Sequence, residues 1–226
     1  MKTFNEDMCI EATRFALLMA TLAGTCVVAS GAPAADLGND SQVVYTAHLH
    51  PMNSVVTGLQ TTGEVRFSVV GDKLTISVTA HGLPPNIVHW QHFHGFADNR
   101  AATCPSTAAD ANGDGIIDLI ETESMAGMTM VPFTDDPVAM DVAHGTYPKA
   151  SAAGTYTYRQ TVSLTGLTAA FAKAFNGQPL DLDRRVVLIH GVVPTSRLPA
   201  SAASLGRIPA DVTLPIACGR IERAKR

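Results

Sequence analysis

The stretch GEVRFSVVGDKLTISVTA, residues 63 to 80, decides the fold class of this chain. On either side of Gly71 and Asp72, larger apolar residues alternate with serine, threonine or charged residues, as they do in strands that bury one face. Gly71 tolerates a positive φ, so Gly71 and Asp72 together indicate a two-residue hairpin turn. The stretch therefore predicts two half-buried antiparallel strands.

The same alternation recurs along most of the chain. It predicts further strands at residues 43–50, 86–95, 129–133, 155–164, 184–191 and 212–222. One short helix is predicted in LTAAFAKAFNG, residues 167–177, which is rich in alanine and ends with glycine. Short strands joined by long loops are typical of an all-β sandwich or barrel.

The composition is that of a globular protein with one main domain. Of the 226 residues, 46% are hydrophobic and 16% are charged, which is enough for one sizeable core. The 16 lysines and arginines are outnumbered by 20 acidic residues, and the sequence pI is about 6.0. A nucleic-acid surface needs a basic stripe, which this balance does not offer, so we expect no nucleic-acid partner.

The N-terminal segment has the pattern of a signal peptide. Residues 15–36, FALLMATLAGTCVVASGAPAAD, form a short apolar run that ends in small residues, with an A-x-A site at Ala32 to Ala34. We expect residues 1–34 to be cleaved and residues 35–226 to form a single exported domain, periplasmic, secreted or at the cell surface. An uncleaved membrane anchor is the alternative, but the apolar run is too short to span a bilayer comfortably.

Two cysteines, Cys104 and Cys218, remain after such cleavage. In an exported protein, a pair of cysteines favours one disulfide over two unpaired thiols. The bridge would close a long loop and so restrict the unfolded chain.

Three of the eight histidines lie in HWQHFHG, residues 89–95. Successive side chains of a strand point to opposite faces, so His92 and His94 share one face and His89 lies on the other. Two imidazoles on one face, joined by a third from a neighbouring strand, would suit copper or zinc. Satisfied or solvent-facing histidines are the alternative.

The segment HWQHFHGFADNRAATC, residues 89–104, resembles the signature of the copper/zinc superoxide dismutases, in which an H-x-H pair on a strand precedes a turn and a disulfide cysteine. Two later segments, RRVVLIHG (184–191) and IACGRIE (216–222), are similar to further segments of that family and follow in the same order. The resemblance implies an antiparallel Greek-key β-barrel or sandwich. Residues 45–85 also resemble the CHRD modules, named after chordin, which share the early hairpin.

Carried over to this chain, the resemblance implies three copper ligands that carry the catalysis: His92, His94 and His190. It also implies that Cys104 pairs with Cys218 and that His89 has a structural role. The implied activity is the dismutation of superoxide to O₂ and H₂O₂, so superoxide or copper ions are the expected partners.

The chain departs from the family at its zinc site and at its guiding arginine. No histidine lies between His94 and His144, so we expect the zinc site to be absent. His144 would supply a fourth copper ligand only if its loop folded back. The guiding arginine would fall at Pro215, and Arg197 or Arg207 would have to replace it from the preceding loop.

The segment DANGDGIIDLIE, residues 110–121, matches the twelve-residue calcium loop at each diagnostic position. Glycine occupies the sharp turn, and six residues would supply oxygen ligands: Asp110, Asn112, Asp114, the Ile116 carbonyl, Asp118 and Glu121. Pro105, shortly before the loop, is poor helix material, so we expect the loop to lack its usual flanking helices. An acidic surface turn that binds nothing is the alternative.

Two further groups of residues could take part in metal binding. The thioethers of Met125, Met128 and Met130 suit Cu(I), although methionine more often fills a core. His48 and His50 share one face of the first predicted strand, where a second, weaker site or an exposed surface are both consistent with the pattern.

The sequence thus predicts an exported protein that binds copper and calcium, lacks zinc, and dismutates superoxide. The alternative is a non-catalytic CHRD-like module that binds copper or calcium, or that handles copper. The three histidines favour the enzyme, while Pro215 and the missing zinc ligands favour the module.

Overall fold

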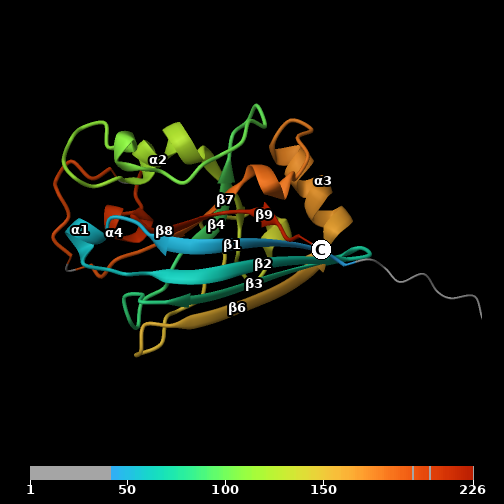
Figure 1. Ribbon diagram of the computed structural model, residues 1–226, viewed down its shortest axis with the longest axis horizontal. Coiled ribbons are helices and arrows are strands. Elements are labelled where there is room, and N and C mark those ends of the chain that lie inside the picture. The colour runs from blue at the N-terminus through green and yellow to red at the C-terminus, as the bar shows by residue number, and fades with distance from the viewer. Residues whose placement is uncertain (1–41, 195, 204, 226) are drawn as a thin grey trace, which may run out of the picture. The chain divides into compact units, whose positions relative to one another are not determined.

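The computed structural model describes residues 42–194, 196–203 and 205–225, and the expected signal peptide lies outside them. Eight strands occupy the eight segments predicted as strands, and a short ninth strand follows (Figure 1). Their bounds are β1 Val43–Pro51, β2 Thr62–Val70, β3 Lys73–His81, β4 Gln91–Gly95, β5 Met128–Pro132, β6 Tyr156–Ser163, β7 Val186–His190, β8 Pro215–Arg220 and β9 Glu222–Arg223.

The strands form one continuous path in the order β5-β4-β7-β8-β1-β2-β3-β6, with β9 paired to β1. Each pair of neighbouring strands is antiparallel. The chain crosses from one half of the path to the other after β3, after β5 and after β6, which places β6 beside β3 and β7 beside β4. These crossed connections make a Greek key, and the predicted all-β antiparallel fold is confirmed.

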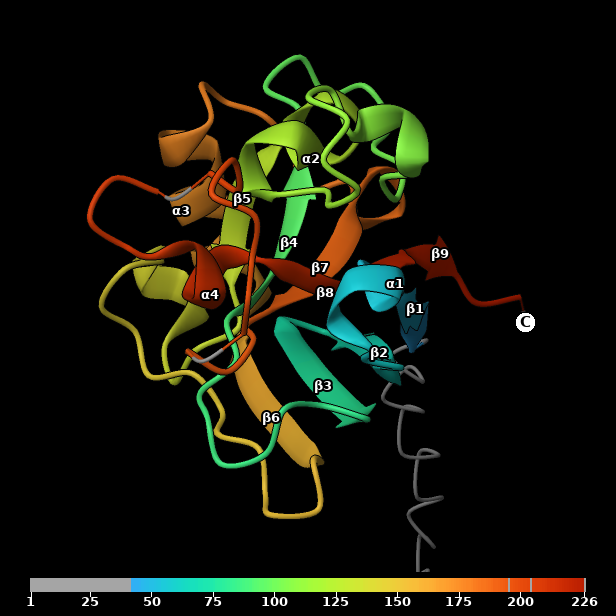
Figure 2. The same ribbon diagram turned by 90° about the vertical axis from the view of Figure 1, so that its left-hand side faces the viewer.

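The sheet curls into a half-barrel with an open seam. In Figure 2, β1, β2, β3 and β6 form one half, and β4, β5, β7 and β8 form the other. Among the described residues, no ladder joins β5 to β6. Instead, the Tyr158 hydroxyl donates to the Thr134 carbonyl at 2.7 Å, and the Gln160 amide donates to the Asp135 carbonyl. Side chains therefore bridge the seam where backbone pairing stops.

The hydrophobic core lies between the two halves. The alternation in the sequence places Phe67 of β2 and Leu74 and Ile76 of β3 in this core, where each is 0% exposed. Phe67 meets Phe133, which follows β5, edge to face at 5.8 Å between ring centroids. A slip of one residue in either strand would turn these side chains to solvent, so the core fixes the register.

Short helices occupy the connections between strands. The α-helices are α1 Ser54–Thr57, α2 Leu119–Ala126, α3 Leu164–Ala174 and α4 Ala210–Thr213, and the 3₁₀ helices are η1 Thr107–Ala109, η2 Pro137–Ala139 and η3 Leu182–Arg184. The predicted helix is α3, which begins earlier than expected because the Ser163 hydroxyl accepts from the Gly166 N–H. None of the described helices is long and apolar enough to cross a membrane.

Helix α2 corrects one expectation, because the 110–121 loop does have a helix on its C-terminal side. The Asp118 carboxylate accepts from the backbone of Ile120 and Glu121, and the Glu121 carboxylate accepts from the Asp118 N–H. This capping box satisfies N–H groups that a helix start leaves free. The calcium-loop pattern and the helix start therefore share two carboxylates, which is why the pattern hid the helix.

The predicted disulfide is present. Cys104 and Cys218 are bonded, with their Cα atoms 5.8 Å apart and 114 positions apart in the sequence. Cys218 lies in the middle of β8, directly opposite Leu188 of β7. The bridge thus ties the long connection between β4 and β5 to the strand beside β7.

Removing the disulfide should lower the free energy of unfolding by roughly 4 to 5 kcal/mol, because the unfolded chain loses a large closed loop. The Cys104→Ala/Cys218→Ala variant and urea unfolding followed by Trp90 fluorescence measure this change. A reductant should destabilise the wild type and leave the double variant unaffected. Equal unfolding midpoints for the two proteins would contradict the expectation.

Candidate metal centre

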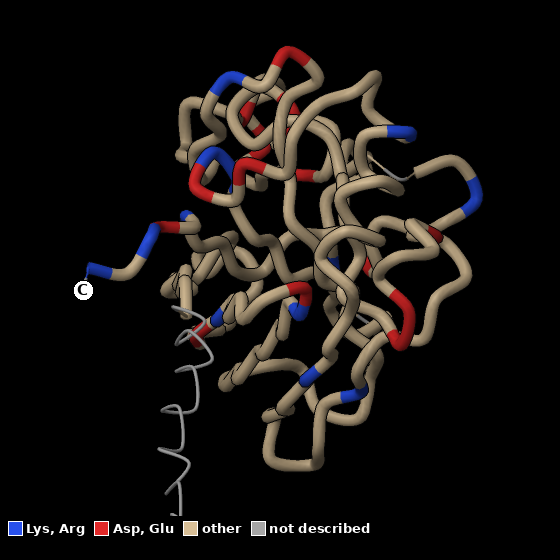
Figure 3. Tube along the Cα trace, turned by 90° about the vertical axis from the view of Figure 1, so that its right-hand side faces the viewer, with Lys and Arg blue, Asp and Glu red and all other residues tan. Residues whose placement is uncertain are grey.

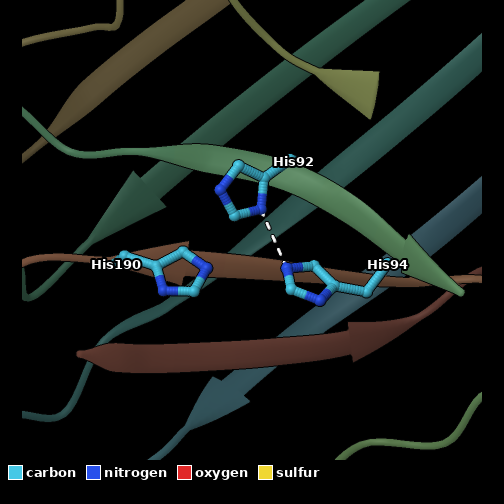
Figure 4. Close-up of side chains that lie close together, drawn as sticks. All are labelled: His92, His94 and His190. Carbon is cyan, nitrogen blue, oxygen red and sulfur yellow. Dashed lines mark hydrogen bonds between the residues drawn. The ribbon is translucent and has the colours of Figure 1, made fainter. Parts of the chain in front are cut away.

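Two neighbouring strands bring three histidines together. His92 and His94 lie on β4, and His190 ends β7, which pairs with β4 so that His92 faces Leu188 across the ladder. All three side chains are buried, with at most 2% exposure. One nitrogen from each ring lies within 4.8 Å of the other two, and Figure 4 shows the rings converging. This is the one such group of His, Cys, Asp or Glu in the described parts of the chain.

Backbone carbonyls fix which nitrogen of two of these rings carries the proton. His94 Nδ1 lies 3.1 Å from the Gly127 carbonyl, and His190 Nδ1 lies 2.7 Å from the Thr213 carbonyl. A carbonyl only accepts, so both Nδ1 atoms donate and both Nε2 atoms keep a lone pair. Orienting partners of this kind are typical of histidines that bind metals.

The two lone pairs point toward different surroundings. His94 Nε2 lies 2.9 Å from His92 Nδ1, the contact drawn in Figure 4. His190 Nε2 is buried, and no hydrogen-bond partner for it exists among the described residues. A buried acceptor without a partner costs free energy, and a metal ion would satisfy it. If His92 changes to its other neutral tautomer, all three rings offer a lone pair to the same place.

The surroundings keep these rings neutral. Burial lowers the pKa of His94 to about 3, aided by repulsion from His190 and opposed by the hydrogen bond to Gly127. Burial also lowers the pKa of His190 to about 4, and that of His92 falls well below its usual value because of burial and the two neighbouring imidazoles. Neutral imidazole nitrogens are ligands for copper and zinc, so the three residues fit such an ion.

His89 precedes β4, and its ring lies against the backbone of His190. It is 0% exposed, its Nδ1 is 3.0 Å from the His190 carbonyl, and its Nε2 is 3.0 Å from the Pro84 carbonyl. The neutral ring donates to one of these two carbonyls, and it lies between the backbone of His190 and the loop after β3. Burial lowers the pKa of His89, while its two carbonyl partners oppose that shift.

Other histidines of interest lie apart from this group. His144 has an 83% exposed side chain, and its Nδ1 contacts the Asp141 carboxylate at 3.0 Å. His48 and His50 share the exposed face of β1, as their alternation predicts. The structure therefore does not bring His144, His48 or His50 to the three buried histidines.

Two shallow hollows adjoin the buried histidines. The first is lined by His92 and His190 with Trp90, Leu119, Thr129, Val142, Leu205 and Thr213. The second is lined by His94 with Leu119, Glu123, Gly127, Met128, Thr129 and Leu205. No lysine or arginine is among the described residues lining either hollow, and both Arg197 and Arg207 are exposed.

The three methionines that could bind Cu(I) lie in different surroundings. Met130 is 1% exposed and packs in the core, and the Met125 sulfur accepts from the backbone and hydroxyl of Ser106. Met128 is 44% exposed and lines the hollow beside His94. Two of the three thioethers thus serve packing or local hydrogen bonding, and Met128 alone adjoins the histidines.

The acidic residues of the 110–121 segment do not form a second group like that of the histidines. Their carboxylates bind the segment's own backbone: Asp110 accepts from Gly113 and Gly115, and Glu121 accepts from Ala111. Figure 3 shows basic and acidic residues interspersed along the described part of the chain, where they form no continuous basic stripe.

Comparisons with known proteins give matches among solved structures alone. No protein-family model matches the chain, and no curated protein matches it. One similar solved structure is the Cu/Zn superoxide dismutase from Brucella abortus. It is 19% identical, with a TM-score of 0.42, and the match covers 79% of this chain and 99% of that chain.

Sequence reasoning missed the residues that orient and surround the histidines. Gly127 and Thr213 act through their backbone carbonyls. Every residue type has such a carbonyl, so the sequence cannot identify these two residues. Leu205 and Thr129 reach the hollows from segments distant in sequence. A polar residue predicted to lie in a core segment is the one signal that could have drawn attention to Thr213, which is 2% exposed.

The buried histidines should make the metal-free protein less stable as the pH falls. Unfolded histidine takes up a proton near pH 6.5, whereas the folded rings do so only near pH 3 to 4, so stability is lost between those values. Lowering the pH from 7 to 5 should reduce the free energy of unfolding by about 2 kcal/mol for each buried ring. Urea unfolding in a chelator measures the loss, and His94→Gln should show a smaller one. Equal stability at both pH values would contradict the expectation.

Proposed function

We propose that this chain is an exported copper protein that dismutates superoxide, with copper held by His92, His94 and His190. The observation that carries the proposal is the convergence of three buried, neutral imidazoles, one of which has an Nε2 lone pair without a partner among the described residues. Bound copper would alternate between Cu(II) and Cu(I), so that one superoxide is oxidised to O₂ and another is reduced, with two protons, to H₂O₂. The sequence resemblance to copper/zinc superoxide dismutases favours the same activity.

Each of the residues around the proposed copper site has a distinct role. His92 and His94 hold the ion from β4, and His190 holds it from β7. The Gly127 and Thr213 carbonyls keep Nε2 of His94 and His190 free of protons. His89 acts as a positioning residue, because its Nδ1 lies 3.0 Å from the His190 carbonyl. Burial excludes bulk water and strengthens these polar contacts.

The proposed site works without zinc. The three histidines form the one candidate transition-metal group in the described parts of the chain, and His144 lies apart from them in an exposed loop. A further ligand to the ion would therefore come from solvent or substrate. The CHRD-like character of residues 45–85 concerns strands β1 to β3, which carry none of the three histidines.

A second candidate is a non-catalytic protein that binds or hands on copper. The observation in its favour is the rim of the site, where no described lysine or arginine lines either hollow. A cationic rim speeds the encounter with an anionic substrate, so its lack lowers the expected association rate. The thioether of Met128, beside His94, is a ligand type that suits Cu(I).

Elemental analysis of protein purified after exposure to copper, zinc and calcium tests the copper site. We expect about one copper and no zinc per chain, from the single set of three histidines. Trp90 is the one tryptophan and lines the hollow beside two of the ligands, so quenching of its fluorescence reports copper binding. His190→Ala should weaken binding by more than the roughly 10- to 100-fold typical of outer-shell changes. The exposed His50→Ala variant is the matched control.

Activity then separates the two candidates. The copper-loaded wild type should consume superoxide, and His92→Ala should lose this turnover while retaining its fold. A copper-loaded wild type without turnover would support the copper-handling protein. A wild type that takes up no copper would overturn both candidates.

We also propose that the 110–121 segment binds calcium and orders the chain beside the copper site. In support, oxygen-bearing residues stand at every ligand position of the twelve-residue pattern. Two of these residues contact the loop before α4: Asp114 accepts from the Ser201 hydroxyl, and Asp118 accepts from the Ala203 N–H at 2.7 Å. A bound cation would offset the repulsion between the negative charges of this acidic segment.

Calcium should raise the stability of the protein. Extracellular calcium modules bind with Kd values down to about 10⁻⁴ M, so about 10 mM calcium would add about 2.7 kcal/mol to the unfolding free energy. Thermal melts with calcium and with a chelator measure this shift. Asp110→Ala should abolish it, and Asp183→Ala, an exposed acidic residue elsewhere, should not. Identical melting of the wild type with calcium and with chelator would contradict the proposal.

Export is proposed on the signal-peptide pattern of residues 1–34 and on the Cys104–Cys218 disulfide, a bond that persists in oxidising compartments.

A further inference from the structure

The hollow beside His92 and His190 contains a buried hydroxyl group that the fold does not use. Thr213, the last residue of α4, lines this hollow and is 2% exposed. Its Oγ1 has no hydrogen-bond partner among the described residues. Its carbonyl is already engaged by His190 Nδ1, so the same residue orients a ligand histidine and presents a spare hydroxyl next to it.

A second hydroxyl lines the same hollow. Thr129 of β5 lines both hollows, and its Oγ1 is 3.3 Å from His94 Nε2. In the metal-free protein, this hydroxyl competes with His92 Nδ1 for the single lone pair of His94 Nε2. When that lone pair is given to a metal, the Thr129 hydroxyl becomes free to donate to another acceptor.

The other walls of the hollow exclude most ligands. Trp90, Leu119, Val142 and Leu205 are largely apolar, and the hollow, of about 10 Å³, has room for roughly one water-sized molecule. The hollow therefore admits one end of a small ligand and rejects bulky anions. In apolar surroundings, a hydrogen bond from a hydroxyl is stronger than in water.

We propose that the Thr213 hydroxyl, assisted by that of Thr129, donates a hydrogen bond to a small monoanion bound end-on beside His92 and His190. This inference rests on the proposed copper site and specifies how that site recognises its substrate. Neutral hydroxyl donors take the place of a cation, because no described lysine or arginine lines the hollow. A buried hydroxyl without a partner is costly for folding, and a ligand that accepts from it accounts for its presence.

Azide serves as the anionic probe for the copper(II)-loaded protein, with its binding followed by optical absorption and electron paramagnetic resonance. Thr213→Val keeps the shape and the carbonyl but removes the hydroxyl. It should weaken azide binding by about tenfold or more, the effect of losing a hydrogen bond to a charged group. Thr213→Ser should restore most of the affinity, and Thr129→Val should show a smaller loss.

Two further measurements exclude a purely structural role for the hydroxyl. Copper affinity, from quenching of Trp90 fluorescence, should be the same in Thr213→Val and the wild type. The melting temperature of metal-free Thr213→Val should equal or exceed that of the wild type, because the variant buries a methyl group in place of an unpartnered hydroxyl.

Unchanged azide affinity in copper-loaded Thr213→Val would overturn this inference and leave the copper site standing. So would a lower melting temperature of that variant combined with wild-type azide affinity, which would assign the hydroxyl to folding. A wild type that binds no copper would overturn the proposed function, and this inference with it.

Discussion

The antiparallel ladder between β4 and β7 is the constraint on which the rest of the site depends. Its register places His92 opposite Leu188, and the pleat of β4 turns His92 and His94 to one face, toward His190 at the end of β7. Three imidazoles on adjacent strands cannot be buried together as cations. The fold keeps them neutral by desolvation, and the Gly127 and Thr213 carbonyls decide the tautomers of two of them. The folded protein therefore loses stability at low pH, because the imidazole nitrogens are kept unprotonated for metal binding.

Three contacts join the loops around this ladder to other parts of the fold. His89 joins the loop after β3 to the backbone of His190. The disulfide joins the connection between β4 and β5 to β8, and Asp118 joins the start of α2 to the loop before α4 through Ala203. Each contact fixes a loop that borders the histidines. The ligand geometry is therefore held from several directions, as precise metal sites require.

Much of the fold could be predicted because two-residue periodicity reports burial directly. The strand segments, the pairing of Cys104 with Cys218, and the shared face of His92 and His94 all follow from spacing or from family resemblance. Helix α2 was missed because its capping carboxylates are also the calcium-loop residues, so one pattern concealed another. The tautomer-setting carbonyls and the Thr213 hydroxyl were out of reach, since they arise from contacts between segments far apart in sequence.

The pairing of Gly95 with Met128 brings the two ends of the 96–127 segment side by side at the edge of the sheet. A loop whose ends are already adjacent costs little additional closure entropy when it grows, so its length can vary at a small cost in stability. This segment contains the calcium-type pattern and α2, but none of the three converging histidines. A different loop grafted between Gly95 and Met128 could therefore change the rim of the centre, provided that it kept the Cys104 bridge and the Gly127 carbonyl that orients His94.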